Sequence, residues 1–499
     1  MYDAIILGAG MSGLAAGIRL AYYQRRVAIL ERHGTVGGLN SFYQRRGRIH
    51  DVGLHAVTNY ASADARLGPL ARALRQLRIA RGDLDLAPQL GSAIAFPGVT
   101  LQFSNDLGLL ESEIARHFRR EQDNFRRLVA SLAPYDQFGQ AQTLRSARQA
   151  VGSLIGDPLL VEMLMCPVLF YGGAREHDMD FGQFSILFRS VFLEGLGRPF
   201  AGIRQILDRL TGKFLELGGE LRLRSPAARI IANAGRVEGV VLEDGTELPA
   251  RSVISSAGWP ETLRLCDRIS PLPPGEGQGV RGLSSGKCGS HSAADFAPPR
   301  PPGGQPPAGG QSIVESISVL NAQPRSLGCD RTIVFYNDSE KFHYREPREP
   351  VDLRSGIVCS PNNFAYPQSL PEGILRVSAL ASYDRWAEMD RDTYARQKRE
   401  WYDRLVEAAA RFVPDFRGAV VDADLFTPVT IRRFTGHDRG AIYGAVEKRC
   451  DGTTHLANLY LAGNDQGLVG IVGAMLSGIG IVNRYLLKSG PVASATETQ

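Results

Sequence analysis

The feature that most constrains this chain is a glycine motif close to its start. Residues 4–7 form an apolar run short enough for a buried parallel strand, and Gly8, Gly10 and Gly13 follow with the spacing G-x-G-x-x-G. This pattern predicts a tight turn into a helix that ends near residue 23, and then a second buried strand over residues 27–30. The order of strand, glycine turn, helix and strand is typical of the βαβ unit that binds a dinucleotide.

Each part of this motif has a physical task. The first glycine permits the turn, the second lets a diphosphate approach the backbone, and the third lets helix and strand pack closely. The helix N-terminus offers free N–H groups and a positive dipole end to the phosphates. Glu31 lies 31 − 10 = 21 positions after the middle glycine, where a carboxylate can accept a hydrogen bond from a ribose hydroxyl. An acid in this register favours an ADP-containing dinucleotide over a βαβ unit without a ligand.

Two further glycine-rich segments indicate that the dinucleotide is FAD. Residues 37–41 read Gly-Gly-Leu-Asn-Ser, a loop that can bring backbone N–H groups to a diphosphate. Residues 458–478 read as a buried strand, a turn that contains Gly463 and Asp465, and a glycine-rich helix. The acid can hold a ribityl hydroxyl, and the helix N-terminus can face the pyrimidine edge of the flavin, where reduction places negative charge.

Both ends of the chain resemble the FAD-dependent phytoene desaturase, carotenoid isomerase and retinol saturase superfamily, within the amine-oxidase-like flavoproteins. Matching text at residues 225–230, 235–240 and 427–444 extends the resemblance over nearly the whole chain, except about 271–312. In many relatives the acid directly follows the last glycine, whereas here Asn464 intervenes, which leaves open whether Asp465 or a backbone group contacts the ribityl chain. The resemblance implies FAD as the cofactor, a long apolar isoprenoid or carotenoid as the substrate, and these cofactor-binding residues: Gly8, Gly10, Met11, Ser12, Gly13, Glu31, Arg32, Gly38, Leu39, Asn40, Ala227, Gly463, Asp465 and Gly473.

The expected fold is α/β, with a Rossmann-like FAD-binding domain (a parallel sheet plus a small antiparallel meander) and an interleaved α+β substrate domain. The FAD-binding domain is expected to be discontinuous and to comprise residues 1–80, 198–270 and 427–490. The substrate-binding domain is expected over residues 81–197 and 312–426. Residues 271–311 are rich in Pro, Gly and Ser and predict a disordered insertion, and residues 491–499 form a polar tail.

Two apolar segments of the expected substrate domain, residues 159–171 and 184–196, are rich in Met, Phe and Leu. They can pack in the core or form the wall of a long apolar tunnel, and the resemblance tips the interpretation toward the tunnel. Arg189 and Arg198 would flank this wall at a membrane surface. A helical pattern over residues 107–132 carries five arginines, which we expect to form a solvated helix face rather than a membrane-docking patch.

Composition excludes several classes of function. The net charge is +5 with basic residues spread along the chain, so nucleic acid is not an expected partner. The six cysteines are scattered without a C-x-x-C pair, which argues against a dithiol relay and against a metal site. No run reaches the roughly 20 apolar residues of a spanning helix. We therefore expect a cytoplasmic protein that can associate peripherally with the inner face of the membrane; the oligomeric state is not predicted.

FAD supplies hydride chemistry, so few polar side chains are needed near the substrate. The candidates for a catalytic role are His55, His437 and Tyr443, although a lone histidine is more often structural. The first interpretation is a phytoene or carotenoid desaturase. The second is a carotenoid isomerase or a retinol-saturase-like enzyme that uses reduced flavin. The third, of another class, is a prenyl-binding escort protein of the GDP-dissociation-inhibitor type, and an amine oxidase is disfavoured because no aromatic cage or flavin-linking cysteine can be placed.

Overall fold

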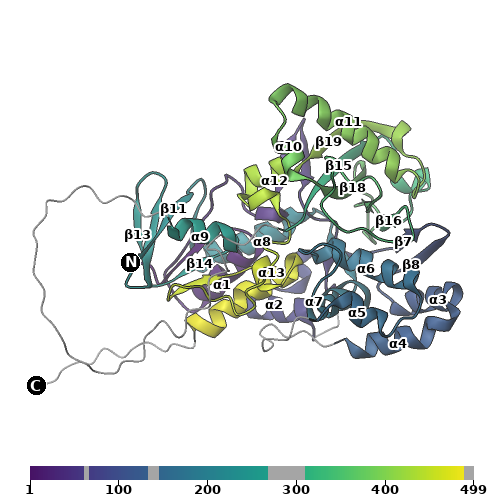
Figure 1. Cartoon of the computed structure of the whole chain (residues 1–499). Coiled ribbons are helices and arrows are strands. Elements are labelled where there is room, and N and C mark those ends of the chain that lie inside the picture. Colours follow the sequence, from purple (N-terminus) through teal and green to yellow (C-terminus); the bar gives the residue numbers. More distant parts are fainter. Residues whose placement is uncertain (61–66, 133–144, 268–309, 488–499) are drawn as a thin grey trace, which may run out of the picture.

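The first apolar run forms the central strand of a parallel sheet. The computed structural model describes residues 1–60, 67–132, 145–267 and 310–487 (Figure 1). The sheet has the order β10-β2-β1-β14-β20, and every neighbouring pair is parallel. Its strands are β10 (Glu220–Arg222), β2 (Val27–Leu30), β1 (Ala4–Leu7), β14 (Val253–Ser255) and β20 (Leu459–Leu461). β1 and β2 are buried throughout, as an apolar run in a parallel sheet requires.

Helices from opposite ends of the chain cover this sheet side by side. α1 (Met11–Tyr22) packs against α13 (Gly470–Ile481) and α8 (Ile203–Glu216) (Figure 1). The close approach of α1 and α13 depends on Gly478, because a Cβ there would lie 2.1 Å from the carbonyl oxygen of Ser12. The pairing brings the last glycine-rich segment of the sequence beside the first one.

An antiparallel meander lies next to the parallel sheet, as the turn signals in the sequence predict. It consists of β11 (Ala227–Asn233), β12 (Arg236–Leu242) and β13 (Glu247–Pro249). α9 (Trp259–Asp267) packs against β11. The parallel sheet, the meander and the covering helices confirm the expected α/β fold class.

A second large sheet has seven strands in the order β19-β15-β18-β17-β16-β7-β8, and all of its pairs are antiparallel except β16 with β7. Its strands come from two distant parts of the chain: β7 (Ser92–Phe96), β8 (Val99–Phe103), β15 (Ser312–Leu320), β16 (Ile333–Asn337), β17 (Ser355–Cys359), β18 (Gly373–Ala381) and β19 (Val420–Phe426). α11 (Arg391–Ala409) packs against this sheet.

A group of helices gathers at the end of the molecule opposite the meander (Figure 1): α3 (Leu107–His117), α4 (Gln122–Ser131), α5 (Ala147–Gly152), α6 (Pro158–Gly172) and α7 (Phe181–Phe188). The single helical pattern predicted over residues 107–132 is two helices, since the buried Phe118 leaves the helical conformation at φ −131° and ψ 57°. The five arginines of this pattern are exposed, as a solvated helix face and a membrane-docking patch both require: Arg116, Arg119, Arg120, Arg126 and Arg127.

The insertion predicted at 271–311 lies outside the described residues except for its last two. Gly310 donates a hydrogen bond to Gly444 O, and the carbonyl of Gln311 accepts one from Ile442 N–H. These two residues therefore belong to the folded body. The predicted tail at 491–499 also lies outside the described ranges, and within those ranges no helix is long and apolar enough to cross a membrane.

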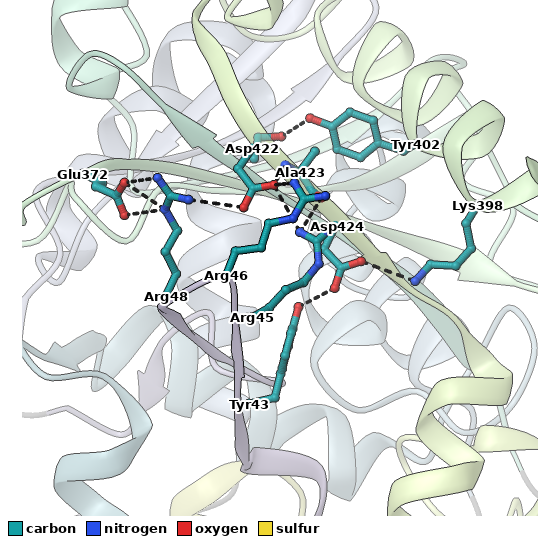
Figure 2. Close-up of polar contacts among 11 residues, drawn as sticks. Tyr43, Arg45, Arg46, Arg48, Glu372, Lys398, Tyr402, Asp422, Ala423 and Asp424 are labelled. Carbon is teal, nitrogen blue, oxygen red and sulfur yellow. Dashed lines mark hydrogen bonds and ion pairs between the residues drawn. The ribbon is translucent and has the colours of Figure 1, made fainter. Parts of the chain in front are cut away.

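A hairpin of β3 (Phe42–Arg45) and β4 (Arg48–Asp51) is tied to β19 by charged groups (Figure 2). Arg46 Nη1 lies 2.7 Å from Asp422 Oδ1, and Arg45 and Arg48 lie 3.2 and 3.4 Å from the same carboxylate. Burial disfavours the ionised form of Asp422, but the N–H of Ala423 and the three arginines outweigh it and lower its pKa below the ordinary 3.8. The hairpin leads directly into the segment that carries His55.

We expect the variant Asp422→Asn to lower the stability of the protein at neutral pH by about 1 kcal/mol, because its three arginine partners are exposed or only partly buried and are screened by solvent. A lowered carboxylate pKa contributes stability that is present above 3.8 and is lost as the pH falls through the folded-state value. The difference in melting temperature between wild type and variant should therefore narrow below about pH 4. Asp123→Asn, in an exposed pair with Arg126, serves as the control. A difference that stayed constant down to about pH 3 would contradict this assignment.

Candidate active site

The first glycine turn assigns a different task to each of its glycines. Gly8 has φ +97°, and a Cβ at Gly13 would lie 2.0 Å from the carbonyl oxygen of Gly8, so both positions exclude side chains for reasons of folding. Gly10 differs, since its φ is −76° and the only atom within 4 Å of an added Cβ is Gly37 O at 3.9 Å. The space in front of Gly10 belongs to a cavity, which is where the diphosphate of a dinucleotide must approach the backbone.

Glu31 ends β2 and faces the same cavity. One oxygen of its buried carboxylate accepts a hydrogen bond from Ala9 N–H at 2.8 Å, and the other accepts one from His33 N–H at 2.8 Å. An ionised carboxylate has about four acceptor sites, so further sites are left for a ribose hydroxyl. Glu31 is thus held by the first glycine turn, next to the place where it was predicted to bind the ribose.

The cavity has a volume of about 520 Å³ and runs from this turn to the seven-stranded sheet. Most of the predicted cofactor-binding residues line it: Gly8, Gly10, Met11, Ser12, Glu31, Arg32, Gly38, Leu39, Asn40, Ala227, Gly463 and Asp465. Gly13 and Gly473 are not part of the lining; Gly13 packs on Gly8, and Gly473 lies against Leu468. These residues, with an open backbone cradle, a helix N-terminus and a carboxylate in register, fit FAD.

The second glycine turn meets the first one, because a Cβ at Gly463 would lie 3.2 Å from Ser12 Oγ. Asp465 is 3% exposed, and its two carboxylate oxygens accept hydrogen bonds from Trp259 N–H at 2.5 Å and Ala445 N–H at 2.6 Å. The acid that follows Asn464 therefore ties two loops together at the cavity wall. Any hydroxyl that it holds must use its remaining lone pairs.

The far end of the cavity contains a polar cluster on the seven-stranded sheet. Glu315 on β15 is paired in register with Ser378 on β18, and Arg376 lies two residues away on the same face. His55, between β4 and β5 (Val57–Thr58), covers the cluster: its Nε2 lies 3.0 Å from Ser378 Oγ and 3.5 Å from Glu315 Oε1. His55, Glu315 and Ser378 all line the cavity.

The carboxylate of Glu315 is fully buried and forms an ion pair with Arg376. Burial raises the cost of ionising Glu315, but Arg376 and His55 outweigh it, and its pKa lies below the ordinary 4.5. Arg376 also donates hydrogen bonds to the carbonyls of Leu54 at 2.8 Å and Asp51 at 3.0 Å. The cluster therefore fixes the backbone of the segment that presents His55.

The sequence did not reveal Glu315, Arg376 or Ser378 as site residues. The signal that could have found Glu315 is an acid in the middle of an otherwise apolar strand, Ser-Ile-Val-Glu-Ser-Ile-Ser-Val-Leu. Such a residue is buried with its neighbours, and a buried carboxylate needs a partner.

The three candidates for catalysis line one cavity but stand on different walls. His437 follows α12 (Pro428–Thr435), and a Cβ at Gly258 would contact both His437 Nδ1 at 3.2 Å and the carboxylate of Glu261. Tyr443 donates a hydrogen bond to the carbonyl of Phe170, and burial raises the pKa of its hydroxyl. Tyr443 is therefore a neutral phenol, and of the three only His55 contacts the buried acid.

The predicted tunnel wall is part of the core instead. Residues 159–171 and 184–196 pack into a cluster with Phe125 and Phe335, in which Met163, Met165 and Phe188 are fully buried. Only Phe170 and Tyr171 from these segments line the cavity. Arg198 does not face a membrane, since it is 5% exposed and forms an ion pair with Asp51.

The chain was compared with known proteins. The family model for flavin-containing amine oxidoreductases matches residues 11–293. Prolycopene isomerase 2 of an Oncidium hybrid cultivar is 22% identical to this chain, and the match covers 94% of this chain and 82% of the isomerase. All-trans-retinol 13,14-reductase of Danio rerio is 24% identical, and the match covers 97% of this chain and 86% of the reductase. A neurosporene-forming phytoene desaturase of Rhodobacter capsulatus is 26% identical over 53% of this chain and 54% of its own. The match with a solved oxidoreductase from Methanosarcina mazei covers 96% of this chain and 100% of that protein, with a TM-score of 0.63. Because the two sequences are 15% identical, this match shows the fold alone.

Proposed function

The chain belongs to the family of flavin-containing amine oxidoreductases, and we propose that it is an FAD-dependent oxidoreductase that acts on carbon–carbon bonds of a long isoprenoid polyene. FAD is its cofactor. Bound FAD supplies a two-electron acceptor or donor that exchanges a hydride with the substrate. The protein contributes the cradle for the diphosphate, the acid for the ribose and a largely apolar chamber for the reacting carbons.

The observation that carries the proposal is the single cavity that joins the glycine turns to the seven-stranded sheet. At the far end, apolar and aromatic side chains line the cavity beside the polar cluster: Phe170, Tyr171, Ile313, Ile357 and Tyr443. Such walls suit the apolar reacting carbons of a polyene and exclude water from a hydride transfer. Relatives named for carotenoid and retinoid substrates support the same substrate class.

Two reactions remain candidates. A phytoene or carotenoid desaturase is the first, with the substrate losing a hydride and a proton. The second is a carotenoid isomerase or retinol-saturase-like enzyme that uses reduced flavin. It is favoured by the extent of the similarities, since the isomerase and the reductase match more than nine-tenths of this chain and the desaturase about half.

A cationic amine is a poorer fit to this cavity. Two acids line the end formed by the second glycine turn and the seven-stranded sheet, Glu315 and Asp465. Glu315 already forms an ion pair with Arg376, and Asp465 accepts hydrogen bonds from two backbone N–H groups. An ammonium group would therefore meet carboxylates whose charge is already compensated. An escort protein that binds no flavin is disfavoured, because FAD is the cofactor of this chain.

We further propose that the protein meets its substrate at the inner face of a membrane, by peripheral contact. A long polyene is too insoluble to arrive through water, so it must be taken from a lipid phase or from another protein. The substrate should accordingly be presented in vesicles, and flotation of the protein with anionic vesicles should weaken as salt rises.

The test incubates the purified protein with phytoene, with all-trans-retinol and with a cis-polyene in vesicles, once oxidised and once reduced with dithionite. The mass of the product separates the reactions: two hydrogens lost means desaturation, two gained means saturation, and an unchanged mass with changed geometry means isomerisation. We expect bound FAD and conversion of at least one polyene. A protein without flavin, or one that left every polyene unchanged but oxidised a small water-soluble amine, would contradict the proposed function.

A further inference from the structure

The segment that carries His55 is held from several sides. The carbonyl of Leu54 accepts hydrogen bonds from Arg198 at 2.7 Å and from Arg376 at 2.8 Å. The carbonyl of His55 itself accepts one from the thiol of Cys359 at 3.7 Å. Two buried arginines and a buried thiol thus fix the backbone from which the imidazole projects. A side chain fixed in this way keeps one orientation toward the cavity.

The two nitrogens of the imidazole have different surroundings. Nε2 faces Ser378 Oγ at 3.0 Å and Glu315 Oε1 at 3.5 Å. Nδ1 makes no hydrogen bond with the residues that the structure describes, and the side chain, which is 13% exposed, lines the cavity. A carboxylate on one nitrogen and an open second nitrogen is the arrangement by which an enzyme presents a histidine as an acid or a base.

The ion pair with Arg376 uses one oxygen of the Glu315 carboxylate. Ile317, the next residue on the same face of β15, is buried, so the charge of Glu315 carries a cost of desolvation. Glu315 Oε2 also has no hydrogen-bond partner in the described part of the chain, although the side chain is completely buried. A buried acid with unused acceptor capacity beside a histidine calls for a functional explanation.

We propose that His55 exchanges a proton with the substrate through Nδ1, and that Glu315 is a positioning residue that orients the ring. The proposal rests on the proposed function and names the residue that handles the proton. Ser378, whose Oγ lies 3.0 Å from Nε2, is the hydrogen-bonding partner of the ring.

The reaction balances in either direction. In saturation, one carbon of the substrate double bond accepts a hydride, the π electron pair moves to the neighbouring carbon, and that carbon takes the proton from His55. The alkene is reduced, FADH⁻ is oxidised to FAD, and the neutral imidazole regains its proton from solvent. In desaturation, His55 removes the proton, a hydride leaves the neighbouring carbon, the double bond forms and FAD is reduced.

This assignment narrows the reaction class. Coupling one hydride to one proton adds or removes two hydrogens, whereas isomerisation leaves the composition of the substrate unchanged. A dedicated proton-transfer group therefore favours desaturation or saturation over isomerisation.

The charged and titratable groups around His55 are Glu315 on β15, Arg376 on β18, Cys359 on β17, and Arg198 on β9 (Leu196–Pro199) with its ion-pair partner Asp51.

The test compares His55→Gln and Glu315→Gln with the control His117→Gln, an exposed residue at the end of α3. Conversion of all-trans-retinol by dithionite-reduced protein and of phytoene by oxidised protein is followed in a single turnover across pH. We expect His55→Gln to slow conversion about 100- to 10,000-fold and to abolish the dependence of the rate on pH. Glu315→Gln should slow it about 10- to 100-fold. Flavin content should match that of wild type in each variant.

A second measurement needs no substrate. The ring nitrogens of labelled histidine are followed by NMR as the pH is changed, and the His55 signals are identified by their absence in His55→Gln. We expect the chemical shifts of the His55 ring nitrogens to change in Glu315→Gln, because the imidazole loses the carboxylate that lies 3.5 Å from Nε2. Glu315→Gln also leaves Arg376 without its ion-pair partner. Glu315→Asp, which keeps a carboxylate, is therefore measured as well, and we expect a smaller change in the His55 signals in the same direction.

The outcomes separate the two proposals. Wild-type protein that converts no polyene contradicts the proposed function. Wild-type protein that converts one, with His55→Gln within about threefold of its rate and with the same pH dependence, overturns the role of His55 alone. A His55 that keeps one protonation state over the whole pH range in which the protein is folded also overturns it, because such a ring cannot exchange a proton.

Discussion

The variant Gly10→Val is expected to fold and to lose FAD. A Cβ at this position has only Gly37 O within 4 Å, at 3.9 Å, and the backbone φ of −76° suits any residue. The added Cβ therefore meets no close atom of the described chain, and the side chain occupies the space that the diphosphate needs. We expect the affinity for FAD to fall at least about 100-fold, equivalent to about 2.7 kcal/mol. The visible absorbance of the purified protein and a titration of the apoprotein with FAD measure this.

The matched control is Gly212→Val on α8, where an added Cβ has no atom of the described residues within 4 Å and which does not line this cavity. It should keep the flavin of wild type. Gly13→Val provides the contrast, since its Cβ would overlap the carbonyl of Gly8 and should prevent folding rather than binding alone. Stability should be compared between apoproteins, because bound FAD stabilises only the folded state. A folded Gly10→Val protein with full flavin occupancy would contradict the position of the cofactor.

The dinucleotide unit could be predicted because its determinants are local. The strand, the three glycines, the helix and Glu31 lie within residues 4–31, and each has a fixed geometric task in that order. The second glycine turn was recognisable for the same reason. What no local pattern could specify is that Gly463 would come to lie against Ser12, since that contact depends on packing between α13 and α1.

The polar cluster at the far end could not be assembled from the sequence. Glu315 and Ser378 meet because β15 and β18 pair in one particular register, over sixty positions apart. Strand partners of this kind are set by the whole sheet, whose order also joins residues 92–96 to residues 333–337. His55 was recognised as a candidate, but its acid could be found only after the pairing was known.

Composition left the interpretation of residues 159–171 and 184–196 open, and the resemblance tipped it toward the tunnel. A core and a tunnel wall are both built from Leu, Met and Phe, so the residue types are the same in either case. The deciding fact is where the side chains point, and here they fill the space between α6, α7 and the seven-stranded sheet. The cavity takes only Phe170 and Tyr171 from them.

The largest loss of stability is expected from Arg376→Met. Arg376 is 2% exposed, neutralises Glu315, and satisfies the carbonyls of Leu54 and Asp51. Removing one partner of a buried ion pair leaves an uncompensated charge, and typically costs about 3–5 kcal/mol. Chemical denaturation of the apoprotein measures this, with Arg417→Met, in an exposed pair with Asp415, as a control that should change little.

The dependence of this loss on pH identifies its cause. In wild type the pKa of Glu315 lies below 4.5, so its ionised form contributes stability above that pH, and the contribution is lost as the pH falls through the folded-state value. Without Arg376, burial raises the pKa of Glu315 above that of the unfolded chain. The variant is therefore destabilised most at neutral pH, and it regains stability as the carboxyl group is protonated. The gap between wild type and Arg376→Met should therefore shrink toward about pH 4, and the double variant Arg376→Met/Glu315→Gln should recover part of the loss at neutral pH. A gap independent of pH, with no recovery in the double variant, would show that Arg376 stabilises the fold only through its hydrogen bonds to the segment that carries His55.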